Sequence, residues 1–271
     1  MFSRLSTLGC LLAISATTMV SGAEVWPMPQ VFNLGSTSTV LDPEFNFHCT
    51  MADGVTACPD PIPAATTRYN NLLFIAGAPS PSWTGTTITG LNITILANLP
   101  LALSVSENYT LNVPVNGIAT LQADTQWAAL RGLESFSQLF DWSGYYGTNG
   151  SQYVLNAAPV AIVDYPRWPW RSLLIDSSRH FLLPSAIMSI LDGMSYLKLN
   201  TLHWHIVDDN SWPLYLESYP LFTKGAYAPD AIYSHADIQQ IVQYAFDRGI
   251  RIIPEFDGVS IIGVYGIYKE K

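Results

Sequence analysis

The chain has 271 residues, of which 49% are hydrophobic and only 12% are charged. Its 12 lysine and arginine residues are outnumbered by 21 aspartate and glutamate residues, which gives a formal net charge of −9 at pH 7. An acidic chain of this kind lacks the basic surface that nucleic-acid binding requires, so the composition argues against nucleic acid as a partner. The length predicts about two domains.

The first 23 residues have the pattern of a secretory signal peptide. Arg4 precedes an apolar run from Leu8 to Val20, and small residues at Ser21 and Ala23 fit cleavage after Ala23. A membrane anchor needs about 20 apolar residues, and this run is shorter and interrupted by Ser and Thr. We therefore expect secretion, or delivery to a vacuolar or lysosomal lumen, without a membrane-spanning segment.

Two cysteines remain once Cys10 has left with the signal peptide. In an oxidising compartment Cys49 and Cys58 most simply form one short disulfide. The alternatives are two free thiols or a metal pair, but no further His or Cys lies at metal-ligand spacing from them.

Three Asn-X-Ser/Thr sequons follow, at Asn92, Asn108 and Asn149. Each can accept a glycan only if it faces solvent in a secreted chain. One sequon occurs easily by chance, whereas three behind a signal peptide predict a glycoprotein.

Residues 24–163 show the pattern of a small α+β domain. Short β-branched or alternating runs, separated by Gly, Pro and Asn, predict strands at 72–76, 87–96, 103–105, 109–113 and 118–122. A helix is predicted to begin at Asp124 or Thr125, because apolar residues from Leu130 to Phe140 recur at helical spacing. The order predicts an antiparallel sheet with a helix on one face. The Pro-rich segment 164–170 is predicted to be the hinge into the next domain.

Residues 171–257 alternate between strand and helix patterns. An apolar run at 173–175 ends in Asp176, the strand-like run 201–207 ends in Asp208 and Asp209, and the run 250–256 ends in Asp257. Helical patterns lie between these runs, the first beginning near Pro184 and the second from Ser234, with Asp237 as a capping residue, to Gly249. Near-continuous apolar strands of this kind predict a parallel sheet, and enzymes with such barrels keep their chemistry at the carboxyl ends of the strands.

Several motifs in this region resemble the β-N-acetylhexosaminidases of glycoside hydrolase family 20. They read PRWPWRSLLIDSSRHF, KLNTLHWHIVDDNSWPL and YSHADIQQIVQYAFDRGIRIIPEFD. The earlier segments ENYTLNV and WAALRGLESFSQLF resemble the non-catalytic domain that precedes the family's barrel. The resemblance implies a non-catalytic domain at 24–163 and the first three strands of a (β/α)₈ barrel at 164–257.

The resemblance also implies an activity and its substrates. Family members hydrolyse terminal β-linked N-acetylhexosamine by substrate-assisted catalysis, in which the acetamido oxygen of the sugar attacks its own anomeric carbon. The expected partners are N-acetylglucosamine- or N-acetylgalactosamine-terminated glycans, or chitin oligomers, and no cofactor is expected. A homodimer is expected for full-length relatives.

Two site roles follow from the resemblance. Arg171 is expected to donate to the hydroxyls of the bound sugar, as a guanidinium with several fixed donors can. Asp208 is expected to support the acid that protonates the leaving oxygen. The alternatives are an ion pair for Arg171 and a turn or capping role for Asp208, a role that Asp209 fits better. Asp176 and Asp257 are structural or supporting residues.

His203 and His205 raise the alternative of a metal-dependent hydrolase, because His-x-His on a strand places two imidazoles on one face. In a regular strand Asp208 shares the opposite face with Trp204 and Ile206, so the acid should not converge with the histidines. We therefore predict buried histidines and no metal.

Trp170, Trp204 and Trp212 could stack on sugar rings, but tryptophan in such strands more often belongs to the core.

The resemblance ends at Asp257, and residues 258–271 diverge from the family pattern. No residue here matches the family's acid-base Glu or its partner Asp, so no catalytic residue is predicted and the chain is expected to be inactive alone. The open edge of an incomplete barrel also predicts poor solubility. A non-catalytic glycan- or partner-binding protein remains the alternative reading.

Overall fold

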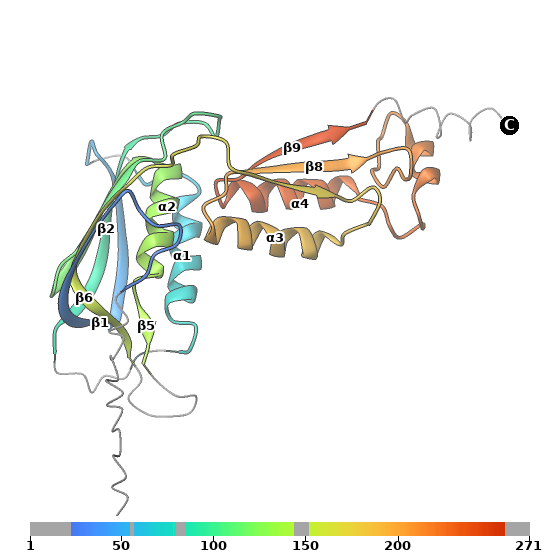
Figure 1. Ribbon diagram of the computed structural model, residues 1–271. Coiled ribbons are helices and arrows are strands. Elements are labelled where there is room, and N and C mark those ends of the chain that lie inside the picture. The colour runs from blue at the N-terminus through green and yellow to red at the C-terminus, as the bar shows by residue number, and fades with distance from the viewer. Residues whose placement is uncertain (1–22, 55–56, 78, 80–84, 144–151, 258–271) are drawn as a thin grey trace, which may run out of the picture.

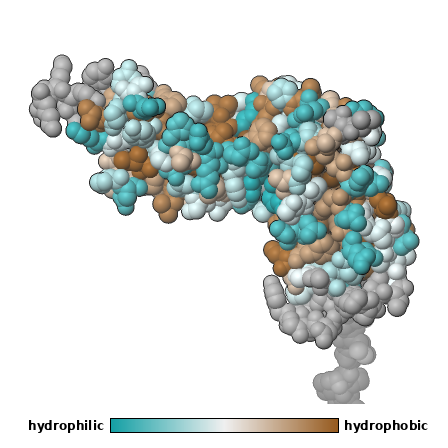
Figure 2. Space-filling view, turned by 180° about the vertical axis from the view of Figure 1, so that it is seen from behind, coloured by the Kyte–Doolittle hydropathy of each residue, from teal (hydrophilic) through white to brown (hydrophobic). Residues whose placement is uncertain are grey.

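The computed structural model describes residues 23–54, 57–77, 79, 85–143 and 152–257. These residues form two lobes that meet at an angle, an amino-terminal lobe of residues 23–164 and a carboxyl-terminal lobe of residues 165–257 (Figure 1). The space-filling view in Figure 2 shows the same bent outline, with hydrophobic residues interrupting the hydrophilic surface of both lobes. The predicted signal peptide lies outside the described residues except for Ala23.

The amino-terminal lobe is built from one sheet and two helices. Its elements in chain order are β1 (Val31–Met51), α1 (Ile62–Leu73), β2 (Thr87–Ala97), β3 (Tyr109–Val113), β4 (Gly117–Thr125), α2 (Gln126–Ser137), β5 (Asp141–Trp142) and β6 (Tyr153–Asp164). The strand order is β1-β2-β4-β3-β6-β5, with a further pairing between β1 and β6. Helices α1 and α2 cover one face of this sheet (Figure 1).

The sheet is mixed, which corrects the antiparallel sheet that we predicted. β1 pairs with β2, and β2 with β4, in parallel, whereas β3 pairs antiparallel with β4 and β6. The parallel pair β1–β2 follows from the crossover through α1, because two neighbouring strands joined by a helix run in the same direction. The long strand β1 arches across the end of the sheet, pairing antiparallel with β6 through residues 31–40 and parallel with β2 through residues 40–51.

Two predicted strands are absent from the described residues, and four elements of the amino-terminal lobe were missed. Residues 72–73 are the last turn of α1 rather than the start of a strand, and residues 103–105 form a turn and the residue after it. β1, α1, β5 and β6 were not predicted. By contrast, the predicted strands 87–96, 109–113 and 118–122 lie within β2, β3 and β4.

Helix α2 begins where predicted. The Thr125 side chain accepts a hydrogen bond from the backbone N–H of Ala128 at 3.2 Å, which satisfies one of the free donors of the first turn. Leu130, Leu133 and Phe136 are buried against the sheet, so the aromatic and aliphatic stripe is core packing, as predicted.

The carboxyl-terminal lobe is a three-stranded parallel sheet with helices on one face. Its elements are β7 (Ser172–Asp176), α3 (Pro184–Tyr196), β8 (Thr201–Val207), the 3₁₀ helix η1 (Pro220–Gly225), α4 (His235–Phe246) and β9 (Arg251–Phe256). The strand order is β7-β8-β9 and both pairings are parallel, which confirms the predicted alternation of strands and helices. Both helices lie on the same side of β8 and β9 (Figure 1).

Alternate side chains of β8 divide between the two faces of this sheet. Leu202, Trp204 and Ile206 belong to the core that includes Ile187 of α3 and Ile241 of α4. The intervening side chains therefore face the side that α3 and α4 leave open.

The predicted capping box of α4 is present: the Ser234 side chain accepts from the Asp237 backbone, and the Asp237 side chain accepts from the Ser234 N–H at 2.8 Å. Gly249 follows the helix with φ +64°, a conformation that L residues with a side chain rarely adopt.

The two lobes are joined by two arginines of the amino-terminal lobe, Arg131, which is buried, and Arg68, which is partly buried. Arg131 of α2 donates to the carbonyl oxygens of Arg248 at 3.2 Å and Gly249 at 2.8 Å, and Arg68 of α1 donates to that of Asp247 at 3.2 Å. These carbonyls lie at and just beyond the end of α4, where free acceptors and the helix dipole favour cations.

Cys49 and Cys58 form a disulfide, as predicted. Asn92 and Asn108 are exposed, whereas Asn149 lies outside the described residues. None of the helices in the described part of the chain is long and apolar enough to cross a membrane.

Candidate functional site

Acidic residues gather where the three strands of the carboxyl-terminal lobe end. Asp176 is the last residue of β7, Asp208 follows β8, and Glu255 is the penultimate residue of β9. The register pairs Asp176 with His205 and His205 with Glu255, so these three lie in one row on the open face of the sheet. Because parallel strands end at the same edge, the row brings charge from all three strands together.

Arg179 lies in the turn after β7 and joins two of these acids. Its guanidinium contacts Asp176 Oδ2 at 2.8 Å and Asp208 Oδ2 at 2.5 Å, and its Nε donates to Asn210 at 3.1 Å. The turn is closed by Asp176, whose Oδ1 accepts from the backbone N–H groups of Ser178 and Arg179. The Arg179 side chain remains 46% exposed, so it faces the space above the strand ends.

Two histidines complete the cluster. Glu255 Oε2 lies 2.7 Å from His203 Nε2 and 2.9 Å from His205 Nδ1, and His205 Nε2 lies 2.7 Å from Asp208 Oδ2. Burial alone would lower the pKa of His205, but hydrogen bonds and charges from Glu255 and Asp208 outweigh burial and raise it. His205 therefore bridges two carboxylates that come from neighbouring strands.

The contact between His205 and Asp208 corrects our expectation that they would not converge. Regular alternation ends at Val207, and Asp208 lies in a tight turn in which its backbone exchanges hydrogen bonds with Ser211 at 3.2 Å in both directions. The register between β8 and β9 also shifts between His205 and Val207. The alternation rule for strands therefore does not apply at Asp208.

Asp176, Asp208 and Glu255 all have a pKa below the ordinary range of their groups. For Asp208, burial would raise the pKa, but hydrogen bonds from His205 and the Asp209 N–H, together with Arg179, lower it. For Asp176, Arg179 likewise overcomes the effect of burial. For Glu255, the hydrogen bond from His205 is the main cause. All three carboxyls are thus ionised near neutral pH.

Arg171 lies at the other end of the sheet. It precedes β7, and β7 carries Asp176 at its carboxyl end, about 16 Å further along the strand. Its Nη2 donates to Glu107 at 2.6 Å, its Nε to the Lys198 carbonyl at 2.9 Å and its Nη1 to the Trp168 carbonyl at 3.0 Å. The structure thus places Arg171 in the ion pair that we considered as its alternative role, and does not bring it to Asp208.

The remaining predicted residues have these places. Asp209 is exposed and donates its backbone N–H to Asp208 Oδ1 at 2.6 Å, and the backbone N–H of Asp257 approaches the Val207 carbonyl at 3.4 Å. Trp204 and Trp212 are buried, as predicted, whereas Trp170 is 45% exposed beside Arg251.

His203 and His205 both contact the same carboxylate oxygen, Glu255 Oε2. Within the described residues, no group of three His, Cys, Asp or Glu side chains could hold a metal ion.

We did not identify Arg179 as a site residue from the sequence, because a loop residue carries no periodic pattern. The available signal was its position three residues after Asp176, at the end of a predicted barrel strand.

Family models match both lobes. The model described as "Glycosyl hydrolase family 20, catalytic domain" matches residues 168–260, and the model described as "beta-acetyl hexosaminidase like" matches residues 25–139. The first match runs three residues past Asp257, where we expected the resemblance to end.

Curated relatives cover both lobes as well. The chain is 36% identical over 234 residues to beta-hexosaminidase subunit B1 of Dictyostelium discoideum, covering 86% of this chain and 40% of the relative. It is 37% identical over 265 residues to the mouse beta-hexosaminidase subunit alpha, covering 92% of this chain and 48% of the relative. The chain thus spans about half or less of the length of the curated relatives it matches.

Solved structures give the same picture for the fold. The chitobiase of Flavobacterium johnsoniae superposes with a TM-score of 0.74 at 27% identity, covering 90% of this chain and 36% of that one. The beta-N-acetylhexosaminidase of Bacteroides fragilis superposes with a TM-score of 0.65 at 22% identity, covering 91% and 48%, a likeness of fold alone.

Proposed function

The chain belongs to glycosyl hydrolase family 20, and from this premise we propose that it carries the first three strands of the family's (β/α)₈ barrel behind a non-catalytic domain. Residues 24–163 form the non-catalytic domain and residues 164–257 the barrel portion. The row of Asp176, His205 and Glu255 then faces the barrel interior, because α3 and α4 occupy the opposite side of the sheet.

We propose that this chain contributes residues to the hydrolysis of terminal, non-reducing N-acetylhexosamine from β-N-acetylhexosaminides. The substrates are glycans that end in N-acetylglucosamine or N-acetylgalactosamine, or chitin oligomers. In this reaction the acetamido oxygen of the sugar is the nucleophile, so the protein must supply a proton donor for the leaving oxygen and groups that hold the sugar.

The observation that supports this assignment is the Arg179–Asp208 pair at the carboxyl ends of the strands. A half-exposed guanidinium already fixed by Asp176 and Asn210 presents several N–H donors in one plane, which suits the hydroxyls of a sugar. We therefore transfer the sugar-holding role that we predicted for Arg171 to Arg179. Asp208 keeps its supporting role, since it orients both Arg179 and His205.

We further propose that residues 23–257 do not hydrolyse these substrates alone. A general acid must be protonated when the substrate arrives, which requires a pKa near or above the working pH. Asp176, Asp208 and Glu255 have the opposite property, because each is held ionised by an Arg or His. The described part of the cluster can bind and orient a sugar, but none of its three carboxyls is a proton donor of the required kind.

The test is the release of nitrophenol from 4-nitrophenyl N-acetyl-β-D-glucosaminide at acidic pH by the secreted chain. We expect no turnover above that of an Asp208→Asn variant, with Asp209→Asn as the matched control. Turnover that Asp208→Asn abolishes and Asp209→Asn retains would contradict inactivity.

A second measurement tests the alternative hypothesis, that the chain is a non-catalytic glycan-binding protein. Retention of the chain on immobilised N-acetylglucosamine, lost in Arg179→Ala and kept in Arg171→Lys, would favour that reading. Absence of retention would rule out the glycan-binding alternative.

A further inference from the structure

The face of the amino-terminal sheet that α1 and α2 do not cover carries a row of polar side chains interrupted by one alanine. One residue from each of five neighbouring strands contributes to this outer-face row, and β1 contributes at both ends. In register order the members are Asn33, Ala161, Asn112, Thr120, Asn92 and His48. The next residues along the strands, such as Leu111, Leu121 and Ile93, are buried on the helix side, so the row faces outward.

The adjacent row on the same face is similar in character. Its members in register order are Val31, Val163, Thr110, Gln122, Thr94 and Thr50. Neither row, all of whose members lie in the described part of the chain, contains an acidic residue, a lysine or an arginine. A flat surface of amides, hydroxyls and short apolar groups suits a neutral, hydroxyl-rich ligand better than an ionic one.

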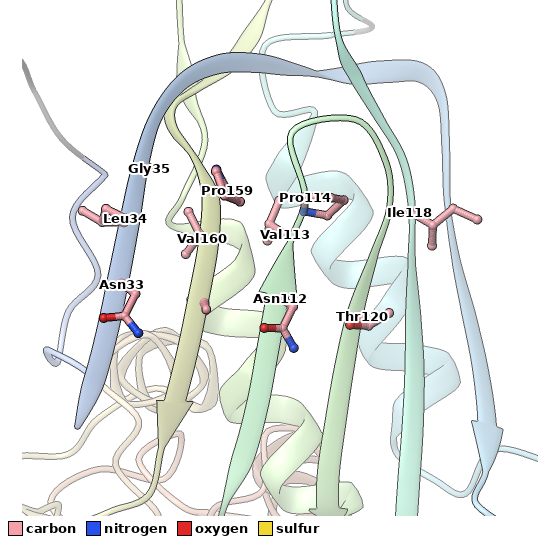
Figure 3. A pocket seen from close by; sticks show the side chains of 11 residues that line it. Asn33, Leu34, Gly35, Asn112, Val113, Pro114, Ile118, Thr120, Pro159 and Val160 are labelled. Atoms are coloured by element: carbon pink, nitrogen blue, oxygen red, sulfur yellow. The ribbon is translucent and has the colours of Figure 1, made fainter.

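A hollow of about 430 Å³ opens beside the outer-face row, beneath the arch of β1. Figure 3 shows Asn33, Asn112 and Thr120 at its lower edge, on β1, β3 and β4, with Pro114 and Pro159 above them. The hollow thus has polar hydrogen-bonding groups along one side and apolar walls on the other. This combination matches a pyranose ring, which has hydroxyls at its rim and C–H groups on its faces.

Asn92 is the point from which a sugar can reach this hollow. It begins the sequon Asn92-Ile93-Thr94 and is exposed in the middle of β2. Its register partner is Thr120, which lines the hollow, and the partner of Thr120 is Asn112, which also lines it. Strands lie about 4.8 Å apart, so Asn112 is about 10 Å from Asn92, a span that two linked sugar rings can cross.

We propose that Asn92 carries an N-linked glycan whose first sugars lie across the outer-face row and enter the hollow beside Asn112 and Thr120. The glycan comes from a polyprenyl-pyrophosphate-linked oligosaccharide of the secretory pathway. The Asn92 amide nitrogen bonds to the anomeric carbon, the anomeric C–O bond breaks, the lipid pyrophosphate leaves with the electron pair, and the nitrogen loses one proton. The glycan then covers a sheet face that no element of the described chain covers.

The first test is glycopeptide mass spectrometry on the full chain secreted from a eukaryotic host. We expect a glycan on Asn92, and an unmodified Asn92 would overturn the proposal. The second test is the rate at which an endoglycosidase that cuts between the two core sugars releases this glycan from the folded protein. A glycan held by two or three hydrogen bonds should be released about tenfold more slowly than from the unfolded chain, and more slowly than any glycan at Asn108.

Variants identify the surface that holds the glycan. Asn112→Ala with Thr120→Ala removes the hydrogen-bonding groups of the hollow while leaving the sequon intact, and should restore fast release. Thr50→Ala with Gln122→Ala removes polar groups from the adjacent row, outside the hollow and outside the sequons of Asn92 and Asn108, and should leave release slow. Equal release from the parent and both double variants would refute docking even where Asn92 is modified, and none of these outcomes depends on glycosidase activity.

Discussion

Arg171 Nη2 lies 2.6 Å from Glu107 Oε2, although 64 residues separate the two in the sequence. Glu107 Oε2 also accepts from Arg131 Nε at 2.6 Å, and its Oε1 accepts from Asn200 at 2.8 Å. Glu107 is therefore a buried anion shared by two arginines, one from each lobe. The junction between the lobes depends on charge as well as on apolar packing.

Arg171→Ala is expected to lower the free energy of unfolding by about 3 kcal/mol, because removing one partner leaves a buried charge incompletely compensated. Urea unfolding of the secreted chain measures the loss. Arg167→Ala is the matched control, since Arg167 is exposed four residues earlier and should change stability by less than about 0.5 kcal/mol. Equal, small losses from both variants would show that Arg171 is not a structural residue.

Acid should weaken the same junction. Burial would raise the pKa of Glu107, but Arg131 and Arg171 lower it to about 2 from an ordinary value of 4.5. A carboxyl with a lowered folded-state pKa contributes stability that is present above pH 4.5 and lost as the pH falls toward 2. The shift corresponds to about 3 kcal/mol. Unfolding experiments between pH 7 and pH 2.5 should show this loss, and Glu107→Gln should have a correspondingly flatter profile.

The sequence predicted the carboxyl-terminal lobe better than the amino-terminal one for a physical reason. β7, β8 and β9 include short apolar runs with clear caps and stops between them, so local pattern and tertiary structure agree. β1 is instead a 21-residue strand whose first half is mostly exposed, which hides any alternation. Helix α1 has the segment TTRYNN, whose residues other than Arg68 have low helix propensity, and it depends on packing of Tyr69 and Leu73.

The site was only partly predictable. Asp208 was identified from the family resemblance, at the end of a predicted strand, and its supporting role stays a proposal. Arg171 and Arg179 could not be told apart by residue type, since both flank β7. Only the fold shows that Arg171 faces Glu107 at one end of the strand while Arg179 meets Asp208 at the other.

The disulfide should stabilise the connection between the end of β1 and the start of α1. Cys49 and Cys58 are nine residues apart, and closing so short a loop contributes about 2–3 kcal/mol through the unfolded state. Intact-mass analysis after alkylation without reductant should show no modified thiol in the folded secreted chain. Cys49→Ser with Cys58→Ser should lower the free energy of unfolding by that amount. Alkylation of both cysteines before reduction is the contrary result.

The outer edge of β9 should make the chain self-associate. Beside β9 and α4 lies an apolar groove of about 650 Å³, and Val242 and Phe256 on its wall are 47% and 50% exposed. Val242→Lys with Phe256→Lys should raise the monomer fraction in light scattering, because charges on an open edge oppose edge-to-edge association. Val163→Lys, at a 42% exposed position on the other lobe, is the control. Equal association of all three chains would place the cause elsewhere.

The histidine cluster should form in this chain without further residues, and its titration is the most direct check. Glu255 and Asp208 raise the pKa of His205 despite partial burial, so its NMR titration midpoint should lie above the ordinary 6.5. Glu255→Gln removes one of the two carboxylates and should lower the midpoint, while Asp209→Asn, which alters a neighbouring exposed acid, should not.

By linkage, a histidine with a raised folded-state pKa contributes stability below pH 6.5 that disappears as the pH rises through the folded value. The parent chain should therefore lose more stability than His205→Gln between pH 6 and pH 8. A midpoint at or below 6.5 would mean that the strand ends are not held together as the structure shows, and the proposed placement of Arg179 and Asp208 would lose its support.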